Sequence, residues 1–345
     1  MALAMTYAGA RNETSTEMAG VLRFPPLDPV RLHSAFGAVA EALRDMPGVE
    51  LNVANAIFGE PDEGFLPDFL AVLKEHYGAA LQTVTFSADA EQARETINRW
   101  VEQQTEGKIA QLIPPGILDC LTRLVLVNAI YFKGRWTRPF LQENTLNQPF
   151  FCLDRRTPTV PFMRGEGKYK LIDIEGGQML GLPYKDGASS MVVILPTRKD
   201  GLLDMEAKVA THLPTWLHQL DGAEWREVEV YLPRFRIGAR IRLDNVLKSL
   251  GITLAFDANA ADFSGMNRRV DNLFIAAALH EAFVEVNEEG TTAGAATAVL
   301  MPLMGEPEPP PLFRANHPFV FLIRGTVAPT TSCVLFLGRL VEPNG

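Results

Sequence analysis

The sequence predicts an α+β fold in which helices are concentrated early in the chain and strands late. Apolar residues recur at helical spacing in several segments before residue 105. The run from Leu124 to Phe132 is apolar on both faces, which is typical of a central buried strand. Short segments with strand periodicity predominate after residue 180. This order favours an α+β architecture over a regular parallel α/β repeat.

The elements follow from this periodicity in chain order. Helices are predicted at 2–22, interrupted by a turn, and at 30–46, 67–77, 90–104 and 243–250. The turn is placed at 9–12 because the Gly and Asn in it suit a helix end. Strands are predicted at 51–58, 83–86, 124–132, 181–184, 190–195, 227–233, 279–287, 319–324 and 333–338.

Length and composition indicate one large domain, residues 1–345. The 345 residues are 47% hydrophobic, so the folded chain can bury about three quarters of the surface that its unfolded form exposes. A net charge of -9 without Lys/Arg runs argues against nucleic-acid and anionic-membrane partners. No apolar stretch reaches the length of a membrane span, and no secretory leader is visible. Cys120, Cys152 and Cys333 fit buried reduced thiols better than a disulfide framework, although one disulfide stays open.

Signatures of catalytic and cofactor sites are absent from the sequence. It contains no G-x-S-x-G, G-x-x-x-x-G-K-[ST] or C-x-x-C pattern. His280-Glu281 begins like a zinc-binding helix but lacks the second His at the required spacing. We therefore expect neither enzymatic activity, nor a cofactor, nor a metal.

Several motifs resemble those of serpins. The most specific is the segment from Asn128 to Trp136, continuing to Pro139-Phe140, and the segment from Phe313 to Ile323 fits the family signature at every position. Further matches occur at Asn98, 105–109, 160–163, 232–235, 262–266 and 335–339. The resemblance implies the serpin fold, with three β-sheets, about eight helices and an exposed reactive-centre loop at about 288–312. It also implies a metastable protease inhibitor that changes conformation.

The segment after the predicted strand at 279–287 is similar to the hinge of inhibitory serpins. It comprises Glu288, Glu289, Gly290, Thr291, Thr292, Ala293, Gly294, Ala295, Ala296 and Thr297. If the cleaved loop enters the main sheet as a strand, alternate side chains, beginning with Thr291, face the core. Those side chains are small and uncharged, so their burial avoids the cost of an unpaired charge. A flexible linker has a similar composition, but the flanking strand and signature favour the hinge.

The family's spacing from Glu288 places the reactive bond between Met304 and Gly305. The preceding residues, 300–303, are apolar. This implies a covalent acyl complex with a serine protease of chymotrypsin-, elastase- or subtilisin-like specificity. A trypsin-like target is disfavoured, and a cysteine protease is a secondary alternative. A non-inhibitory serpin, acting as a carrier or chaperone, is the runner-up, but its usual bulky or charged hinge residues are absent.

Four further residues match serpin positions in the regions called the shutter and the breach. Asn128 and His280 match a polar pair beneath the strands that part during insertion, or form a satisfied core pair without a switching role. Arg234 and Glu288 match a salt bridge at the top of the sheet, or form an exposed pair worth about 0–1 kcal/mol. Trp136 matches a breach residue, and by default is a large core aromatic.

The remaining expectations concern partners and the start of the chain. The predicted helix at 30–46 offers only Arg31, His33 and Arg44 to a polyanion, so heparin activation is not expected. By resemblance, residues 2–5 correspond to the middle of the family's second helix, and the first helix, a core strand and the usual shutter serines are missing. Loss of those elements favours association through uncovered apolar surface, but we expect a monomer. The family favours an extracellular location.

Overall fold

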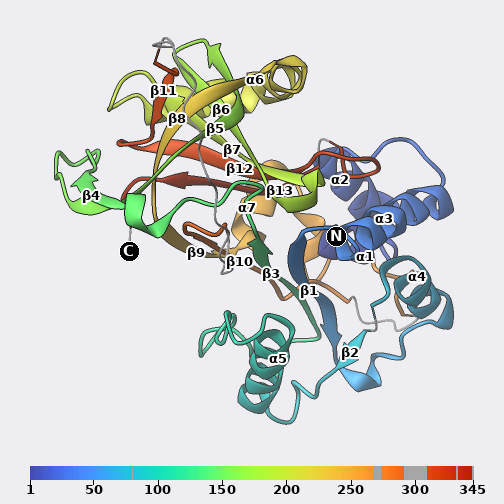
Figure 1. Ribbon diagram of the computed structural model, residues 1–345. Helices are drawn as coiled ribbons and strands as arrows, with labels where there is room; N and C mark the ends of the chain where they lie inside the picture. Colours follow the sequence, from blue (N-terminus) through green and yellow to red (C-terminus); the bar gives the residue numbers. More distant parts are fainter. Residues whose placement is uncertain (80, 268–272, 291–308, 332, 344–345) are drawn as a thin grey trace. The chain divides into compact units, whose positions relative to one another are not determined.

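The computed structural model describes residues 1–79, 81–267, 273–290, 309–331 and 333–343 (Figure 1). Seven α-helices occur in these ranges: α1 (Ala2–Tyr7), α2 (Asn12–Leu22), α3 (Pro29–Arg44), α4 (Pro67–Tyr77), α5 (Ala90–Gln104), α6 (Leu202–Gly222) and α7 (Leu243–Leu250). The same ranges contain strands β1 (Val49–Gly59), β2 (Gln82–Thr83), β3 (Leu124–Gly134), β4 (Leu146–Pro149), β5 (Thr159–Ile174), β6 (Gly177–Pro183), β7 (Ser189–Pro196), β8 (Trp225–Pro233), β9 (Phe235–Arg242), β10 (Ala277–Val286), β11 (Leu312–Arg314), β12 (Phe319–Gly325) and β13 (Val334–Leu340).

Most predicted elements are confirmed. The helices predicted at 67–77, 90–104 and 243–250 are α4, α5 and α7 with the same bounds. Helix α5 begins where Asp89 accepts a hydrogen bond from the backbone N–H of Gln92 at 2.9 Å, which satisfies one of the free donors of the first turn. Helix α7 ends at Gly251, whose φ of 110° is a conformation that favours glycine.

The chain forms two compact units, and unit 1 consists of Met1–Arg44, Leu51–Tyr131 and Gly238–Phe283. Most residues of a five-stranded sheet, in the order β2-β1-β3-β10-β9, lie in unit 1. Leu124 and Leu126 of β3 pack in one core with residues of α1, α4 and α7. Val125 and Val127 pack in a second core with residues of α5. Because side chains alternate along a strand, β3 is covered on both faces, as its apolar pattern predicted.

Unit 2 consists of Asp45–Glu50, Phe132–Ile237 and Val284–Gly345. It contains an eight-stranded sheet in the order β11-β8-β5-β6-β7-β12-β13, with β4 paired to β5. Helix α6 packs on this sheet through a core that includes Met205 and Leu220 of the helix and Leu322 of β12. At the end of α6, Asp221 accepts a hydrogen bond of 2.9 Å from the buried Arg324 of β12.

Several details differ from the sequence prediction. The described residues form two sheets where three were expected, because the long strand β5 pairs with β8 over 162–170 and with β6 over 170–174 and so joins both sets. Strands β4, β5, β9 and β11 and helix α6 were not predicted. Helix α6 contains Pro214, which interrupts the usual helical pattern. The strand predicted at 83–86 ends at Thr83, because the amides of Phe86 and Ser87 donate instead to the carboxylate of Glu60.

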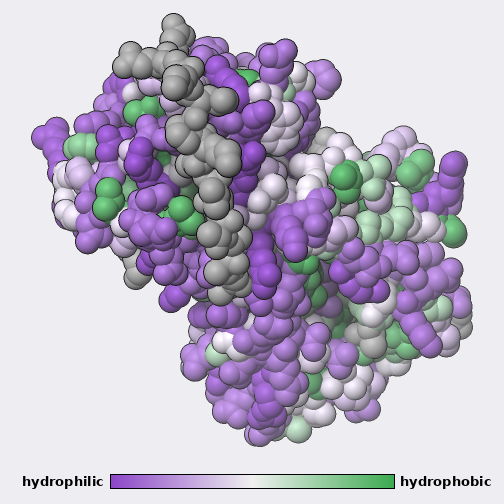
Figure 2. All heavy atoms as spheres, viewed as in Figure 1, coloured by the Kyte–Doolittle hydropathy of each residue, from purple (hydrophilic) through white to green (hydrophobic). Residues whose placement is uncertain are grey.

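Other expectations can be compared with the described part of the chain. No helix there is both long and apolar enough to cross a membrane. No cluster of potential metal ligands occurs in the same residues. All three cysteines are free, but Cys120 is exposed, so the expectation of buried thiols was wrong at that position. The face viewed in Figure 2 is largely hydrophilic over α5, which agrees with the amphipathic pattern of that helix.

Candidate functional site

Strand β10 ends in a tight turn that runs from Asn287 to Gly290. The N–H of Asn287 donates to the carbonyl of Gly290 at 2.9 Å, and the N–H of Gly290 donates to the carbonyl of Asn287 at 3.2 Å. The Asn287 side-chain oxygen also accepts the N–H of Glu289 at 3.1 Å, a bond that Asn commonly forms in turns. The first predicted hinge residues, Glu288 to Gly290, therefore reverse the chain and do not extend β10.

The turn requires glycine at position 290. Gly290 has a φ of 130° and forms an isolated bridge with Arg135, just beyond the end of β3. A Cβ atom built on Gly290 would lie 2.1 Å from the carbonyl oxygen of Gly134 and 2.6 Å from Cα of Arg135. Both contacts are with backbone atoms, so a larger residue would displace the chain from this position.

Trp136 holds the turn from the β3 side. Its indole N–H donates to the carbonyl of Asn287 at 3.0 Å, and its backbone N–H donates to the carbonyl of Glu289 at 3.0 Å. The ring is 3% exposed and stacks on Tyr184, with centroids 4.7 Å apart and an angle of 9° between planes. Trp136 is thus a core aromatic whose polar edge binds the turn at the start of the predicted hinge, and this arrangement is compatible with both interpretations of the residue.

Arg234 and Glu288 form an ion pair at the same turn. The Glu288 side chain is 3% exposed and accepts hydrogen bonds from Arg234 Nε at 2.6 Å and from the Thr145 hydroxyl at 2.5 Å. Burial by itself would raise the pKa of Glu288, but the bonds from Arg234 and Thr145 outweigh it and hold that pKa below its usual value. The interpretation as an exposed pair does not fit a carboxylate that is this buried.

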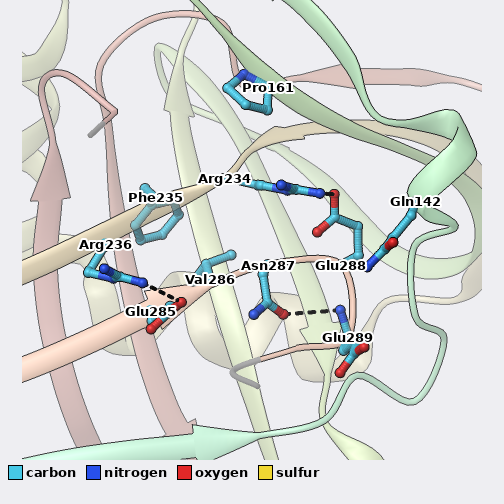
Figure 3. Close-up of a pocket in the computed structure, with 10 residues that line it drawn as sticks. All are labelled: Gln142, Pro161, Arg234, Phe235, Arg236, Glu285, Val286, Asn287, Glu288 and Glu289. Atoms are coloured by element: carbon cyan, nitrogen blue, oxygen red, sulfur yellow. Dashed lines mark hydrogen bonds and ion pairs between the residues drawn. The ribbon is translucent and has the colours of Figure 1, made fainter. Parts of the chain in front are cut away.

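Arg234 and Glu288 line a pocket of about 370 Å³ (Figure 3). In this view Arg234 points to Glu288, while Arg236 of β9 points to Glu285 of β10 at 2.9 Å. The Glu285 side chain is 20% exposed, whereas the Glu288 side chain is 3% exposed. Both are Arg–Glu ion pairs, but only Arg234 neutralises a carboxylate that is almost fully buried.

A second polar cluster lies in unit 1, on three strands of the five-stranded sheet. Nδ1 of His280 on β10 and Oδ1 of Asn128 on β3 are 2.5 Å apart, so the His280 ring donates through Nδ1. The Asn128 amide in turn donates to Oδ1 of Asn55 on β1, also at 2.5 Å. The cluster therefore connects β1, β3 and β10 through side chains, in addition to their backbone pairing.

The structure brings together the predicted residues that it describes, in two groups. Trp136, Arg234 and Glu288 meet at the turn, and Asn128 meets His280. Two further residues of these groups, Asn55 and Thr145, were not predicted from the sequence. Asn55 is a polar residue in phase with the apolar Leu51, Val53 and Ile57 of its strand, which was a usable signal, whereas Thr145 lies in a segment without periodicity. The hinge from Thr291 to Thr297 and the reactive bond at Met304-Gly305 lie outside the described residues.

The whole chain matches a known family. The model of the serpin family, described as serine protease inhibitors, matches residues 1–343. The chain therefore belongs to the serpin family. Leukocyte elastase inhibitor A of Mus musculus is 39% identical to it over 99% of this chain and 90% of that protein. Leukocyte elastase inhibitor of Bos taurus is 40% identical over the same shares of the two chains.

Solved serpin structures confirm the α+β serpin fold. Uncleaved ovalbumin is similar with a TM-score of 0.85 and 33% identity, over 99% of this chain and 90% of that chain. An Arabidopsis serpin in its native stressed conformation has a TM-score of 0.85 and 31% identity, over 99% of this chain and 88% of that chain.

Replacing Arg234 with Ala removes the charged partner of the buried Glu288 carboxylate. We expect this variant to lose about 2 kcal/mol of unfolding free energy near neutral pH. Denaturant unfolding followed by tryptophan fluorescence measures the loss. Arg236→Ala is the matched control, because it breaks a more exposed pair and should cost less than about 1 kcal/mol. Equal losses in the two variants would contradict the assigned role of burial.

The cluster around His280 makes stability depend on pH. Burial lowers the pKa of His280 below 6.5, although the bond to Asn128 and the charge of Glu281 act in the opposite direction. The unfolded state therefore takes up the proton first, and stability decreases as pH falls from about 6.5 toward the lowered pKa.

The variant His280→Gln keeps a neutral hydrogen-bonding side chain but cannot be protonated in this range. We expect it to lose less unfolding free energy than the parent protein between about pH 7.5 and about pH 5.5. Burial also lowers the pKa values of His33 and His317. Both residues are present in the variant and in the parent protein, so they do not affect the difference in unfolding free energy between the two. His218→Gln, at an exposed position, is the control; a pH dependence that His280→Gln leaves unchanged would assign the effect elsewhere.

Proposed function

We propose that this chain is a suicide inhibitor of serine proteases that cleave after apolar side chains, in particular elastase-like enzymes. The family match supports inhibition as the general function, and relatives that are 39–40% identical carry the name leukocyte elastase inhibitor. The predicted bait residue Met304 follows Leu300, Met301, Pro302 and Leu303, all apolar. Such a segment fits an apolar primary pocket and not one built for Lys or Arg.

The observation that carries the proposal is the direct adjacency of β3 and β10. The two strands are neighbours in the five-stranded sheet, and the chain turns back immediately after β10. A loop that follows this turn can enter the sheet only if β3 and β10 separate and the turn opens. The contacts that must then break include the bond between Asn128 and His280 and the two bonds that Trp136 donates to the turn. The ring contact between Tyr131 and Phe283 must break as well.

In the proposed mechanism the protease's serine oxygen attacks the carbonyl of Met304. An ester bond forms between the serine and Met304, the peptide bond to Gly305 breaks, and the released amine takes up a proton. The freed segment then enters between β3 and β10 as a new strand. Insertion that is faster than hydrolysis of the ester leaves the protease trapped. The chain acts in this scheme as a substrate and inhibitor, and not as a catalyst.

The hinge composition supports this step over the carrier or chaperone alternative. Thr291, Ala293, Ala295 and Thr297 are the side chains that would turn inward, and none is charged or bulky. Each can be buried without the several kcal/mol that an unpaired charge costs in a sheet core. A non-inhibitory protein has no need for this pattern.

Incubation with chymotrypsin, elastase and subtilisin tests the proposal. We expect a complex with at least one of these enzymes that survives denaturing electrophoresis, because the acyl bond is covalent. Mass spectrometry of the released C-terminal peptide should place its new N-terminus at Gly305, within one or two residues. Clean cleavage without any stable complex would identify a substrate and not an inhibitor.

Thr291→Arg tests the insertion step. Its long cation would enter the core side of the sheet at a cost of several kcal/mol, so insertion should slow. We expect this variant to be cut at the same bond but to release active protease, measured as a raised stoichiometry of inhibition. Thr292→Arg is the matched control, because its side chain should face solvent after insertion. If both variants inhibit as well as the parent protein, the assigned alternation is wrong.

A further inference from the structure

Three side chains form a row across one end of the eight-stranded sheet. Arg314 of β11 is paired in register with Tyr231 of β8, and Tyr231 is paired in register with Arg164 of β5. The three strands lie side by side in Figure 1. Directly paired residues on neighbouring strands place their side chains on the same face. Both guanidinium groups accordingly lie near the Tyr231 ring, Arg314 at 4.8 Å and Arg164 at 5.9 Å from its centroid.

The two arginines differ in how their charge is neutralised. Arg164 lies 2.7 Å from the carboxylate of Glu229 and 3.5 Å from that of Glu166. Arg314 is exposed, and none of the ion pairs within the described ranges includes it. Its direct partners among the described residues are the face of Tyr231 and the side-chain oxygen of Gln148, to which it donates a hydrogen bond. Both are uncharged, and the more distant carboxylate of Glu229, whose pKa Arg314 helps to lower, is already paired with Arg164.

Arg314 is therefore an exposed cation that forms no ion pair within the described residues, so its guanidinium group can bind an external carboxylate. The stacked ring and the bond to Gln148 already restrict its rotamers, so a partner loses little additional side-chain entropy when it binds. A guanidinium group fits a carboxylate through two parallel hydrogen bonds, which Lys cannot reproduce. Arg and Tyr are also the residue types enriched among the energetically dominant contacts of protein interfaces.

The row lies within reach of a protease bound at the predicted bait. A chain running from Gly305 to Arg314 spans at most about 30 Å when fully extended. A protease domain of about 200 residues is roughly 40 Å across. An enzyme whose active site holds the bond between Met304 and Gly305 can thus place its surface beside β11.

We propose that Arg314, stacked on Tyr231, is a docking contact for an acidic side chain near the active-site rim of the target protease. The inference rests on the proposed function and adds a determinant of target choice outside the loop. The net charge of the chain is -9, so the whole molecule does not attract an acidic partner. The contact acts locally, within a screening length of about 10 Å at moderate salt, and charges at an interface rim change mainly the association rate.

The test measures the rate constant of loop cleavage by whichever of chymotrypsin, elastase and subtilisin cuts the parent protein fastest. We expect Arg314→Glu to be cut roughly tenfold more slowly at low ionic strength, with the difference shrinking as salt is raised. Arg314→Gln removes the charge but keeps a side chain that can donate hydrogen bonds, and should be cut at an intermediate rate. Arg198→Glu makes the same change of charge at a side chain that is 70% exposed and should leave the rate unchanged.

Equal rates for Arg314→Glu and Arg198→Glu, or faster cleavage of Arg314→Glu, would overturn the proposal. The cleavage rate can be measured whether the cut protein traps the protease or releases it. Release of active protease by the parent protein would therefore count against the proposed inhibitory mechanism alone. Matching thermal unfolding midpoints of the three variants exclude a general loss of folding as the cause.

Discussion

The buried carboxylate of Glu288 fixes the point at which the chain leaves strand β10. With 3% of its side chain exposed, this group must be neutralised, and Arg234 and Thr145 supply the donors. That requirement holds the turn from Asn287 to Gly290 in place and brings its carbonyl groups to Trp136. The conformation at the start of the predicted loop thus depends on one charge that water cannot solvate.

Beyond their backbone pairing, β3 and β10 are joined by polar contacts as well as by apolar ones, such as the contact between the rings of Tyr131 and Phe283. Asn128 and His280 join the two strands, and Trp136 joins the end of β3 to the turn after β10. A hydrogen bond contributes only about 1 kcal/mol net, because its groups can bond to other partners when it breaks. A polar network can therefore hold one arrangement and be exchanged for another at small cost, which a close-packed apolar seam would not permit. This property is what a protein that inserts its own loop requires.

Arginine serves three different purposes in unit 2, and its neighbours distinguish them. Arg234 compensates a buried acid, and Arg164 is neutralised by Glu229 and Glu166 at the surface. Arg314 is held by an uncharged ring and an uncharged amide, so its orientation is fixed while its charge remains. Of the three, only Arg314 forms no ion pair within the described residues, although its charge also acts on the Glu229 carboxylate. Its exposed guanidinium group can therefore bind a partner.

The sequence by itself determined the α+β class, the approximate positions of most elements and the serpin resemblance, because hydrophobic periodicity and local motifs are encoded in neighbouring residues. The two-sided apolar pattern of 124–132 correctly predicted a central strand. Tertiary structure alone decided that β5 joins two sets of strands, that Glu288 is buried against Thr145, and that Asn55 completes the cluster of Asn128 and His280. Tertiary structure also placed Arg314 where it forms no ion pair with any of the described residues. Each of these depends on pairing between residues far apart in the chain, whose geometry no local pattern specifies.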